Sequence, residues 1–207
     1  MYNLKYFSII FALIGCCCSL TCAKGFSCEQ GWSKLGINCF KVFTFYGSYG
    51  AENFANSKDA KSRCEALGAN LASLHSSFEN QFVQELVRKS YAQCQKDNVP
   101  WCCDSYTYDG YWIGMSLTRA SNGTILSAKW SDGTNTHYGN PLKFADRTPW
   151  YTPEHRPKQD NTESNCVFML LTNSGIGWAD YDCAMAKIGG YVCKKKAKKA
   201  ATLQEIF

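Results

Sequence analysis

The sequence predicts an α+β domain built around an antiparallel sheet. Two stretches with the periodicity of amphipathic helices lie in the first half of the chain, and short strand-like segments follow in the second half. Strands and helices do not alternate, which argues against a parallel sheet with crossover helices. The 207 residues are 45% hydrophobic, enough apolar material for one packed core, so we expect a single domain.

The N-terminus predicts a signal peptide. An uncharged apolar run, Phe7 to Leu20, precedes a small-residue pattern that ends at Ala23. We therefore expect a signal peptide over residues 1–23 and a secreted, extracellular protein without stable membrane insertion after cleavage. Two alternatives stay open. Tyr6 to Ala23 comes close to the ~17 residues that a membrane-spanning anchor needs, and Cys16 follows a short pattern typical of lipoprotein acylation sites.

The cysteine count predicts a disulfide framework. The chain has 13 cysteines, and cleavage after Ala23 would remove Cys16, Cys17, Cys18 and Cys22, leaving nine. Such a density in a secreted chain is typical of disulfide-bonded domains. An odd number leaves one thiol over, which would allow a disulfide-linked dimer, unless earlier cleavage retains Cys22. The nine are Cys28, Cys39, Cys64, Cys94, Cys102, Cys103, Cys166, Cys183 and Cys193.

Two helices are expected. The first spans residues 56–68, starts at capping residues, ends at Gly68 and directs Cys64 toward the core. The second begins at the capping box Ser76-x-x-Glu79. Its apolar stripe consists of Phe82, Val83, Leu86 and Val87.

Two long loops are expected between these elements and the strands. Residues 92–109 lack periodicity and predict a loop stapled by Cys94 bonded to Cys102 or Cys103. Residues 134–162 hold four of the five prolines, and a loop of that length in a compact domain is usually functional or disordered. The expected strands lie in a hairpin within residues 27–44 and in segments 111–117, 125–134, 166–171, 177–183 and 189–195.

Lysines near the C-terminus contribute much of the net charge of +5. The cluster consists of Lys194, Lys195, Lys196, Lys198 and Lys199. We expect a solvated basic tail over residues 197–207. A strip that docks to anionic glycans or membrane surfaces is the alternative, because clustered ammonium groups attract polyanions. For a secreted protein we expect no nucleic acid partner.

Catalysis is not expected. The three histidines, His75, His137 and His155, are scattered, and the cysteines are expected to be paired, so no nucleophile lies near a base. A zinc site from Cys102, Cys103 and a histidine lacks a recognised spacing. The sequon Asn122-Gly123-Thr124 predicts N-glycosylation at Asn122 in a turn.

Several segments, in order, resemble the C-type lectin-like domain. "CEQGWSKLGINCFK" is similar to its opening hairpin, "CEALGANLASLHSSFENQFV" to its two helices and the strand between them, and "WIGM" to its central strand. "WSDGT", "CVFM" and "WADYDC" with "YVCKK" follow in the expected order. The resemblance covers residues 28–195, so we place the domain at 24–196. It implies the disulfides Cys28–Cys39, Cys64–Cys193 and Cys166–Cys183, and a cis peptide bond before Pro157.

The resemblance also bears on calcium. Sugar-binding members hold Ca²⁺ with oxygen ligands from a Glu-Pro-Asn or Gln-Pro-Asp triplet, a Glu shortly before a cysteine, and a Trp-Asn-Asp triplet. The matching positions here are Arg156-Pro157-Lys158, Ser164 with Glu163 displaced by one residue, and Trp178-Ala179-Asp180. Each cation at about 4 Å from Ca²⁺ would cost several kcal/mol at an effective dielectric of about 20. We therefore expect no calcium and no other cofactor. The alternative is a shifted loop that binds metal through Glu154, Asp160, Glu163 and Asp180.

The resemblance implies a binding protein with a glycan or protein ligand. The candidate surface is the long loop, with Trp150, Tyr151, Arg156, Pro157, Lys158, Glu163 and Asp180. The two cations beside aromatic rings suit sulfated or sialylated sugars, because cations pair with anionic groups and ring faces stack on sugars. The competing interpretation is exposed loop charges with one ring buried at the loop base. Calcium-independent protein recognition by the same surface is the alternative function.

Overall fold

The computed structural model describes residues 25–44, 55–97, 108–143, 148–158, 161–185 and 188–199. The predicted signal peptide over residues 1–23 lies outside the described residues, as do Cys102, Cys103 and Asp160. No helix within the described ranges combines the length and apolar composition needed to cross a membrane.

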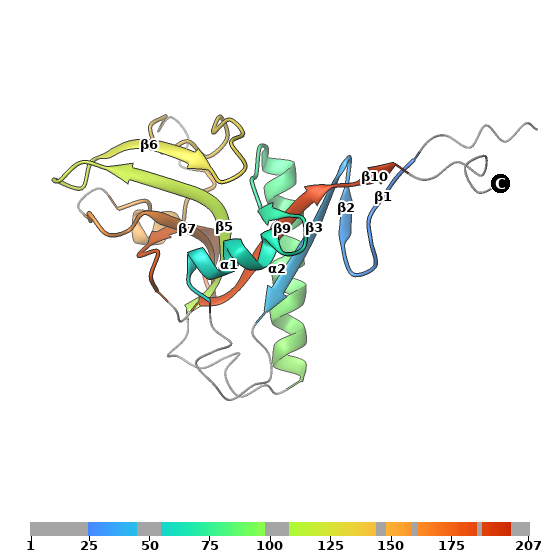
Figure 1. Cartoon of the computed structure of the whole chain (residues 1–207). Helices are drawn as coiled ribbons and strands as arrows, with labels where there is room; N and C mark the ends of the chain where they lie inside the picture. Colours follow the sequence, from blue (N-terminus) through green and yellow to red (C-terminus); the bar gives the residue numbers. More distant parts are fainter. Residues whose placement is uncertain are drawn as a thin grey trace, which may run out of the picture.

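The described chain forms an α+β domain, as predicted (Figure 1). One sheet has eight strands, with the path β2-β3-β9-β5-β7-β8, β4 beside β9 and β6 beside β5; a second sheet pairs β1 with β10. The pairings are antiparallel except for β5 with β9, which is parallel. The elements are β1 (Phe26–Ser27), β2 (Ser33–Leu35), β3 (Asn38–Thr44), α1 (Ser57–Glu65), β4 (Asn70–Leu71), α2 (Ser77–Lys96), β5 (Tyr108–Arg119), β6 (Ile125–Trp130), a 3-10 turn η2 (Thr152–Glu154), β7 (Cys166–Thr172), β8 (Gly175–Tyr181), β9 (Ile188–Lys196) and β10 (Lys198–Lys199).

Side chains on successive strand residues enter two separate cores, one on each face of the sheet. On β5, Ile113 belongs to the cluster that contains Val83 and Val87 of α2, whereas Trp112 belongs to the cluster that contains Cys64 of α1. β7, β8 and β9 alternate in the same way. Successive residues of a strand point to opposite faces. The continuous apolar run of β7 is therefore explained by burial on both sides, with one helix covering each face.

The predicted helix starts are confirmed. The Asn56 side chain accepts a hydrogen bond from the Asp59 backbone N–H at 2.9 Å, and Ser76 accepts one from Glu79 N–H at 3.1 Å. Glu79 Oε2 in turn accepts from the backbone N–H of His75 at 2.8 Å. These bonds satisfy donors that the first turn of a helix leaves unpaired.

The end of α2 corrects one prediction. The lack of periodicity predicts a loop from residue 92, but α2 continues to Lys96. This last part of the helix is largely exposed, so it carries no apolar stripe that periodicity could detect. Gln and Lys are good helix formers, and Lys96 lies favourably at the negative end of the helix dipole.

Three disulfide bonds of the structure agree with those implied by the resemblance. They join Cys28 to Cys39, Cys64 to Cys193 and Cys166 to Cys183, with Cα atoms 5.7, 5.5 and 5.0 Å apart. The second ties α1 to β9 across 129 residues of sequence. The staple expected between Cys94 and Cys102 or Cys103 lies outside the described residues.

Candidate functional site

The second half of the long loop is fastened to β8 around Trp178. The backbone N–H of Trp178 donates to Pro149 O at 2.9 Å, and the N–H of Tyr151 donates to Trp178 O at 2.8 Å. The fully buried Trp178 ring meets three other aromatic rings edge-on, those of Trp130, Tyr138 and Trp150, at centroid distances of 5.6, 5.7 and 5.8 Å. This aromatic cluster gives the loop a fixed base.

Trp150 and Tyr151 belong to that base, and Trp150 also lines a pocket beside α2. They are only 5% and 6% exposed. The indole N–H of Trp150 donates to Gly139 O at 3.0 Å, and the Tyr151 hydroxyl lies 2.7 Å from the Thr172 hydroxyl. The prediction that both rings present faces for stacking on a sugar is therefore wrong in its placement, because each ring fills the interior and its polar atom already has a partner inside the protein.

Arg156 is also buried, at 7% exposure, and its guanidinium faces inward. Its Nη1 donates to the backbone O and the Oδ1 of Asp180 at 2.8 and 3.4 Å, and its Nη2 donates to Glu154 Oε2 at 2.9 Å. The sequence predicts that Arg156 meets anionic sugars at the surface. The structure corrects this placement, because a buried guanidinium requires fixed acceptors and finds them in Asp180 and Glu154.

A second arginine, Arg119 at the end of β5, completes the charge cluster around Asp180. Its Nη2 donates to Asp180 Oδ2 at 2.8 Å, and its Nε donates to Ser164 O at 3.0 Å. The backbone N–H of Lys158 lies 3.1 and 3.2 Å from the two carboxylate oxygens of Asp180. The cluster of Arg119, Glu154, Arg156 and Asp180 thus locks the loop to the strand that carries Asp180.

The donor set does not fit calcium. Asp180 is fully buried, and both its carboxylate oxygens accept hydrogen bonds from positively charged or backbone N–H groups. A calcium ion needs 6–8 oxygen ligands and would here face two guanidinium groups instead. The peptide bond between Arg156 and Pro157 is cis, as the resemblance implies. Pro157 keeps the proline of the family triplet. Guanidinium nitrogens of Arg119 and Arg156 occupy the space around Asp180, the acidic residue that remains from the Trp-Asn-Asp triplet.

The remaining predicted loop residues are more open. The residues Lys158 and Glu163 are exposed, whereas Pro157 is buried. The shifted metal set would need Glu154, Glu163 and Asp180 together with Asp160, which lies outside the described residues. Among the residues that the structure does describe, no three His, Cys, Asp or Glu side chains come close enough to hold a metal ion.

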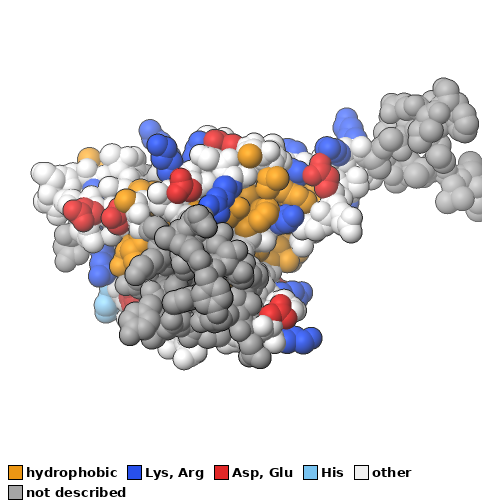
Figure 2. Space-filling view, turned by 60° about the horizontal axis from the view of Figure 1, so that its bottom comes forward, with side chains coloured by type: hydrophobic (Ala, Val, Ile, Leu, Met, Phe, Trp, Pro, Cys, Tyr) orange, Lys and Arg blue, Asp and Glu red, His pale blue; other side chains and the backbone are white. Residues whose placement is uncertain are grey.

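The lysine cluster is part of the fold and is partly neutralised. Lys194 is 2.7 Å from Glu79 and donates to Ser73 O at 2.8 Å, while Lys195 and Lys198 are 2.7 and 2.8 Å from Glu29. Hydrogen bonds from these two lysines lower the pKa of Glu29 to about 2. Lys198 and Lys199, predicted to lie in a tail, pair with Ser27 and Phe26 of β1. On the face shown in Figure 2, blue and red side chains lie among one another.

The fold also brings together a serine, a histidine and an aspartate that the sequence leaves apart. Ser73 Oγ donates to Asp132 Oδ2 at 2.5 Å and lies 3.1 Å from His75 Nε2, which also lies 3.1 Å from Thr134 Oγ1. In a catalytic triad the carboxylate orients the histidine, whereas here it binds the serine directly. Ser73 is 1% exposed, so its hydroxyl is out of reach of a substrate. This network joins β4 to the turn after β6 and has a structural role.

The fold, the three disulfides and the loop geometry define a C-type lectin-like domain, and the sequence comparison agrees. Residues 54–195 match the family model of the lectin C-type domain, so the chain belongs to this family. It is 27% identical over 169 residues to snaclec crotocetin-1 of Crotalus durissus terrificus, covering 82% of each chain. It is 28% identical over 148 residues to one chain of the snaclec coagulation factor IX/factor X-binding protein of Protobothrops flavoviridis, covering 70% of this chain and 80% of the relative.

The fold is also similar to that of a solved lectin domain. The C-type lectin domain of murine dendritic cell inhibitory receptor 2, in complex with an N-glycan, superposes with a TM-score of 0.53 at 21% identity, covering 82% of this chain and 99% of that one. At this identity the likeness concerns the fold alone.

Proposed function

We propose that this protein is a secreted, non-catalytic recognition module that binds a glycan at the long-loop end of the domain without calcium. The observation that carries the proposal is the state of Asp180. Its two carboxylate oxygens bind Arg119, Arg156 and the Lys158 backbone, with Asp180 and both guanidinium groups buried. A carboxylate held in this way stabilises the loop from within and has no oxygen left for a metal that would hold sugar hydroxyls.

The family supports a binding role, and its solved member with a bound N-glycan supports a glycan as the ligand class. The burial of Arg156 argues against sulfated or sialylated sugars held by that residue. We therefore favour a neutral glycan over an anionic one. Secretion is supported by the predicted signal peptide and by three disulfides, which persist in oxidising compartments.

The test is a glycan array probed with and without a chelator, together with thermal melting in the presence of calcium. We expect glycan binding that the chelator does not change. We also expect no rise in melting temperature with calcium, whereas a bound ion at 100 times its Kd would add about 2.7 kcal/mol. Chelator-sensitive binding, or a calcium-dependent rise, would show that the metal-free proposal is wrong.

Calcium-independent protein recognition is the second candidate. It is favoured by the relative that is described as a coagulation factor IX/factor X-binding protein, at 28% identity over 70% of this chain. One measurement distinguishes the two functions. A protein ligand would keep its affinity after enzymatic removal of its glycans, whereas a glycan ligand would lose it.

A further inference from the structure

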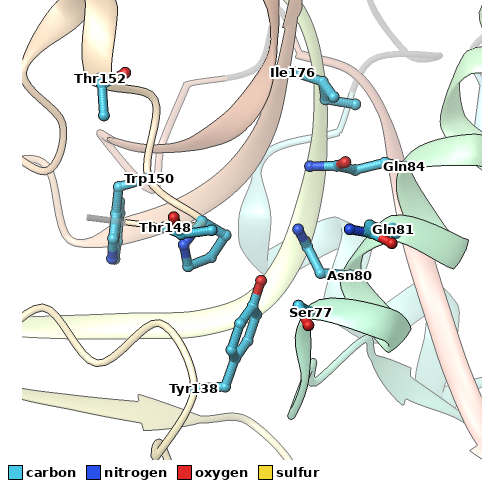
Figure 3. A pocket seen from close by; sticks show the side chains of 10 residues that line it. Ser77, Asn80, Gln81, Gln84, Tyr138, Thr148, Trp150, Thr152 and Ile176 are labelled. Carbon is cyan, nitrogen blue, oxygen red and sulfur yellow. The ribbon is translucent and has the colours of Figure 1, made fainter. Parts of the chain in front are cut away.

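A pocket lies between the first half of α2 and the long loop (Figure 3), and none of the four residues of the Asp180 cluster lines it. It has a volume of about 380 Å³. Its lining includes Asn80, Gln81 and Gln84 from the helix and Tyr138, Trp150 and Thr152 from the loop. None of the described residues that line it carries a charge. The pocket is therefore polar and aromatic, but electrically neutral.

Asn80 is fixed in one orientation by a buried hydrogen bond. Its Oδ1 accepts from the indole Nε1–H of Trp178 at 2.9 Å, and Trp178 is fully buried. An indole N–H can only donate, so the carbonyl side of the Asn80 amide must face Trp178. The NH₂ side of the same amide then faces the pocket, where Figure 3 shows the Asn80 nitrogen directed toward the open centre.

The Asn80 NH₂ group has no hydrogen-bond acceptor among the described residues. Asn80 is 4% exposed, and in the part of the chain that the structure describes its side chain forms no hydrogen bond besides the one to Trp178. Since this nitrogen is not a buried atom without a partner, it reaches the solvent of the pocket, where a ligand oxygen can replace water as its acceptor. This side chain therefore marks a position for a ligand oxygen.

Neighbouring groups complete the site. Gln84 lies one helical turn after Asn80, so both amides project from the same face of α2. Figure 3 shows the Gln84 amide and the hydroxyl end of Tyr138 directed toward the same space as Asn80. An amide group offers both donors and an acceptor, which matches the mixed hydrogen bonding of sugar hydroxyls. A charged ligand would find no counter-charge here and would pay for its desolvation.

We propose that this pocket binds one residue of an uncharged saccharide, with Asn80 and Gln84 as its hydrogen-bonding groups and no metal ion. The inference rests on the proposed function and adds the site and the ligand class. The volume lies at the small end of the range of ligand pockets, which fits a single sugar ring better than an oligosaccharide. A free sugar and the terminal residue of a protein-linked glycan share this chemistry.

The first experiment follows the side-chain amide NMR signals of Asn80, Gln81 and Gln84 in the presence of a chelator. The probes are the neutral sugars mannose, galactose and N-acetylglucosamine, and a sulfated form of N-acetylglucosamine. We expect at least one neutral sugar to shift these signals, and the sulfated form to bind more weakly. If every neutral free sugar leaves these signals in place, a glycoprotein that carries neutral glycans is tested as the next probe. The proposal is overturned if this probe also leaves the signals in place, or if only the sulfated sugar moves them.

The second experiment compares matched variants on the same helix. Gln84→Met keeps the chain length but removes the amide, and should weaken the bound neutral sugar about tenfold, the effect of losing hydrogen bonds worth about 1.4 kcal/mol. Gln93→Met makes the same change on the exposed last part of α2 and should leave affinity unchanged. Equal effects of the two variants would overturn the site.

Asn80→Asp provides a further variant. It keeps an oxygen for Trp178 but replaces the NH₂ donor with an acceptor, so sugar affinity should fall, and urea unfolding of the variant shows whether it remains folded with a carboxyl group at this buried position. These variants also allow the pocket and the proposed function to be tested separately. Calcium-independent glycan binding that Gln84→Met and Asn80→Asp leave unchanged would refute the pocket and keep the function, whereas loss of all glycan binding to the wild type would refute both. A further outcome is binding of a glycoprotein but of no free sugar. This result would identify protein-linked glycans as the ligand if Gln84→Met and Asn80→Asp weaken the binding, and it would refute the pocket if they do not.

Discussion

The charge cluster around Asp180 makes the sharpest prediction, because its two carboxylates differ in burial. Asp180 and Glu154 both pair with Arg156, but the Asp180 side chain is 0% exposed and the Glu154 side chain is 45% exposed. Asp180 also pairs with Arg119, whose side chain is 1% exposed. Asp180→Asn would remove the buried carboxylate that the two guanidinium groups share and leave Arg156 with only the half-exposed Glu154, whereas Glu154→Gln removes a partner that water can replace.

The expected magnitudes follow from that difference. Breaking a buried ion pair by removing one partner costs about 3–5 kcal/mol, and a domain of this size loses roughly 2–4 °C of melting temperature per kcal/mol. Asp180→Asn should therefore lower the melting temperature by roughly 6–20 °C. Glu154→Gln should cost about 0–1 kcal/mol, as exposed pairs do.

Urea unfolding with the disulfides intact, followed by tryptophan fluorescence, measures both variants against the wild type. Trp178 lies two residues before Asp180, so part of the fluorescence change reports unfolding close to the charge cluster. Asp180→Asn should shift the midpoint strongly without changing the slope. Equal and small effects of the two substitutions would refute the reasoning, because they would mean that Asp180 does not neutralise buried arginines.

Three further predictions concern other parts of the molecule. Replacing Cys64 and Cys193 by alanine should destabilise the domain by about 5 kcal/mol, since their bond closes a loop of 129 residues; a loss under about 1 kcal/mol in urea unfolding would contradict this. Partial burial of the imidazole, followed by the charge of Lys194, lowers the pKa of His75 below 6.5. The stability that His75 contributes should therefore be complete above pH 6.5 and be lost as the pH falls through the folded pKa, so the wild type should lose more melting temperature on acidification than His75→Gln. Asn122 is exposed in the turn after β5, and treatment of protein expressed through a secretory pathway with an N-glycosidase should reduce its mass, whereas Asn122→Gln should show no such change.

Features encoded by neighbouring residues were predicted well from the sequence. The capping residues Asn56 and Ser76 start the two helices because their side chains bond backbone groups only three residues away. The strand segments were recognised from their apolar and aromatic content. The last turns of α2 were missed because an exposed helix end needs no apolar stripe.

The candidate site was predicted less well, because its contacts join residues far apart in the sequence. Arg119 and Asp180 are 61 positions apart, and Asn80 and Trp178 are 98 apart. Nothing in the local sequence around Arg156 shows that its charge will be buried, since the loop is polar and rich in proline. Only the burial of Arg156 against a carboxylate distinguishes an internal ion pair from a cationic surface.

The sequence by itself thus determined the α+β class, the helix boundaries at their capped ends and, through the family motifs, the three disulfides and the replacement of the calcium-binding triplet. The tertiary structure decided what the replacement residues do. β5, β7 and β8 lie side by side, which brings Arg119 within 2.8 Å of Asp180, and the loop folds Arg156 onto the same carboxylate. A buried charge needs a partner at close range, and only the folded arrangement of strands and loop decides which residue supplies it.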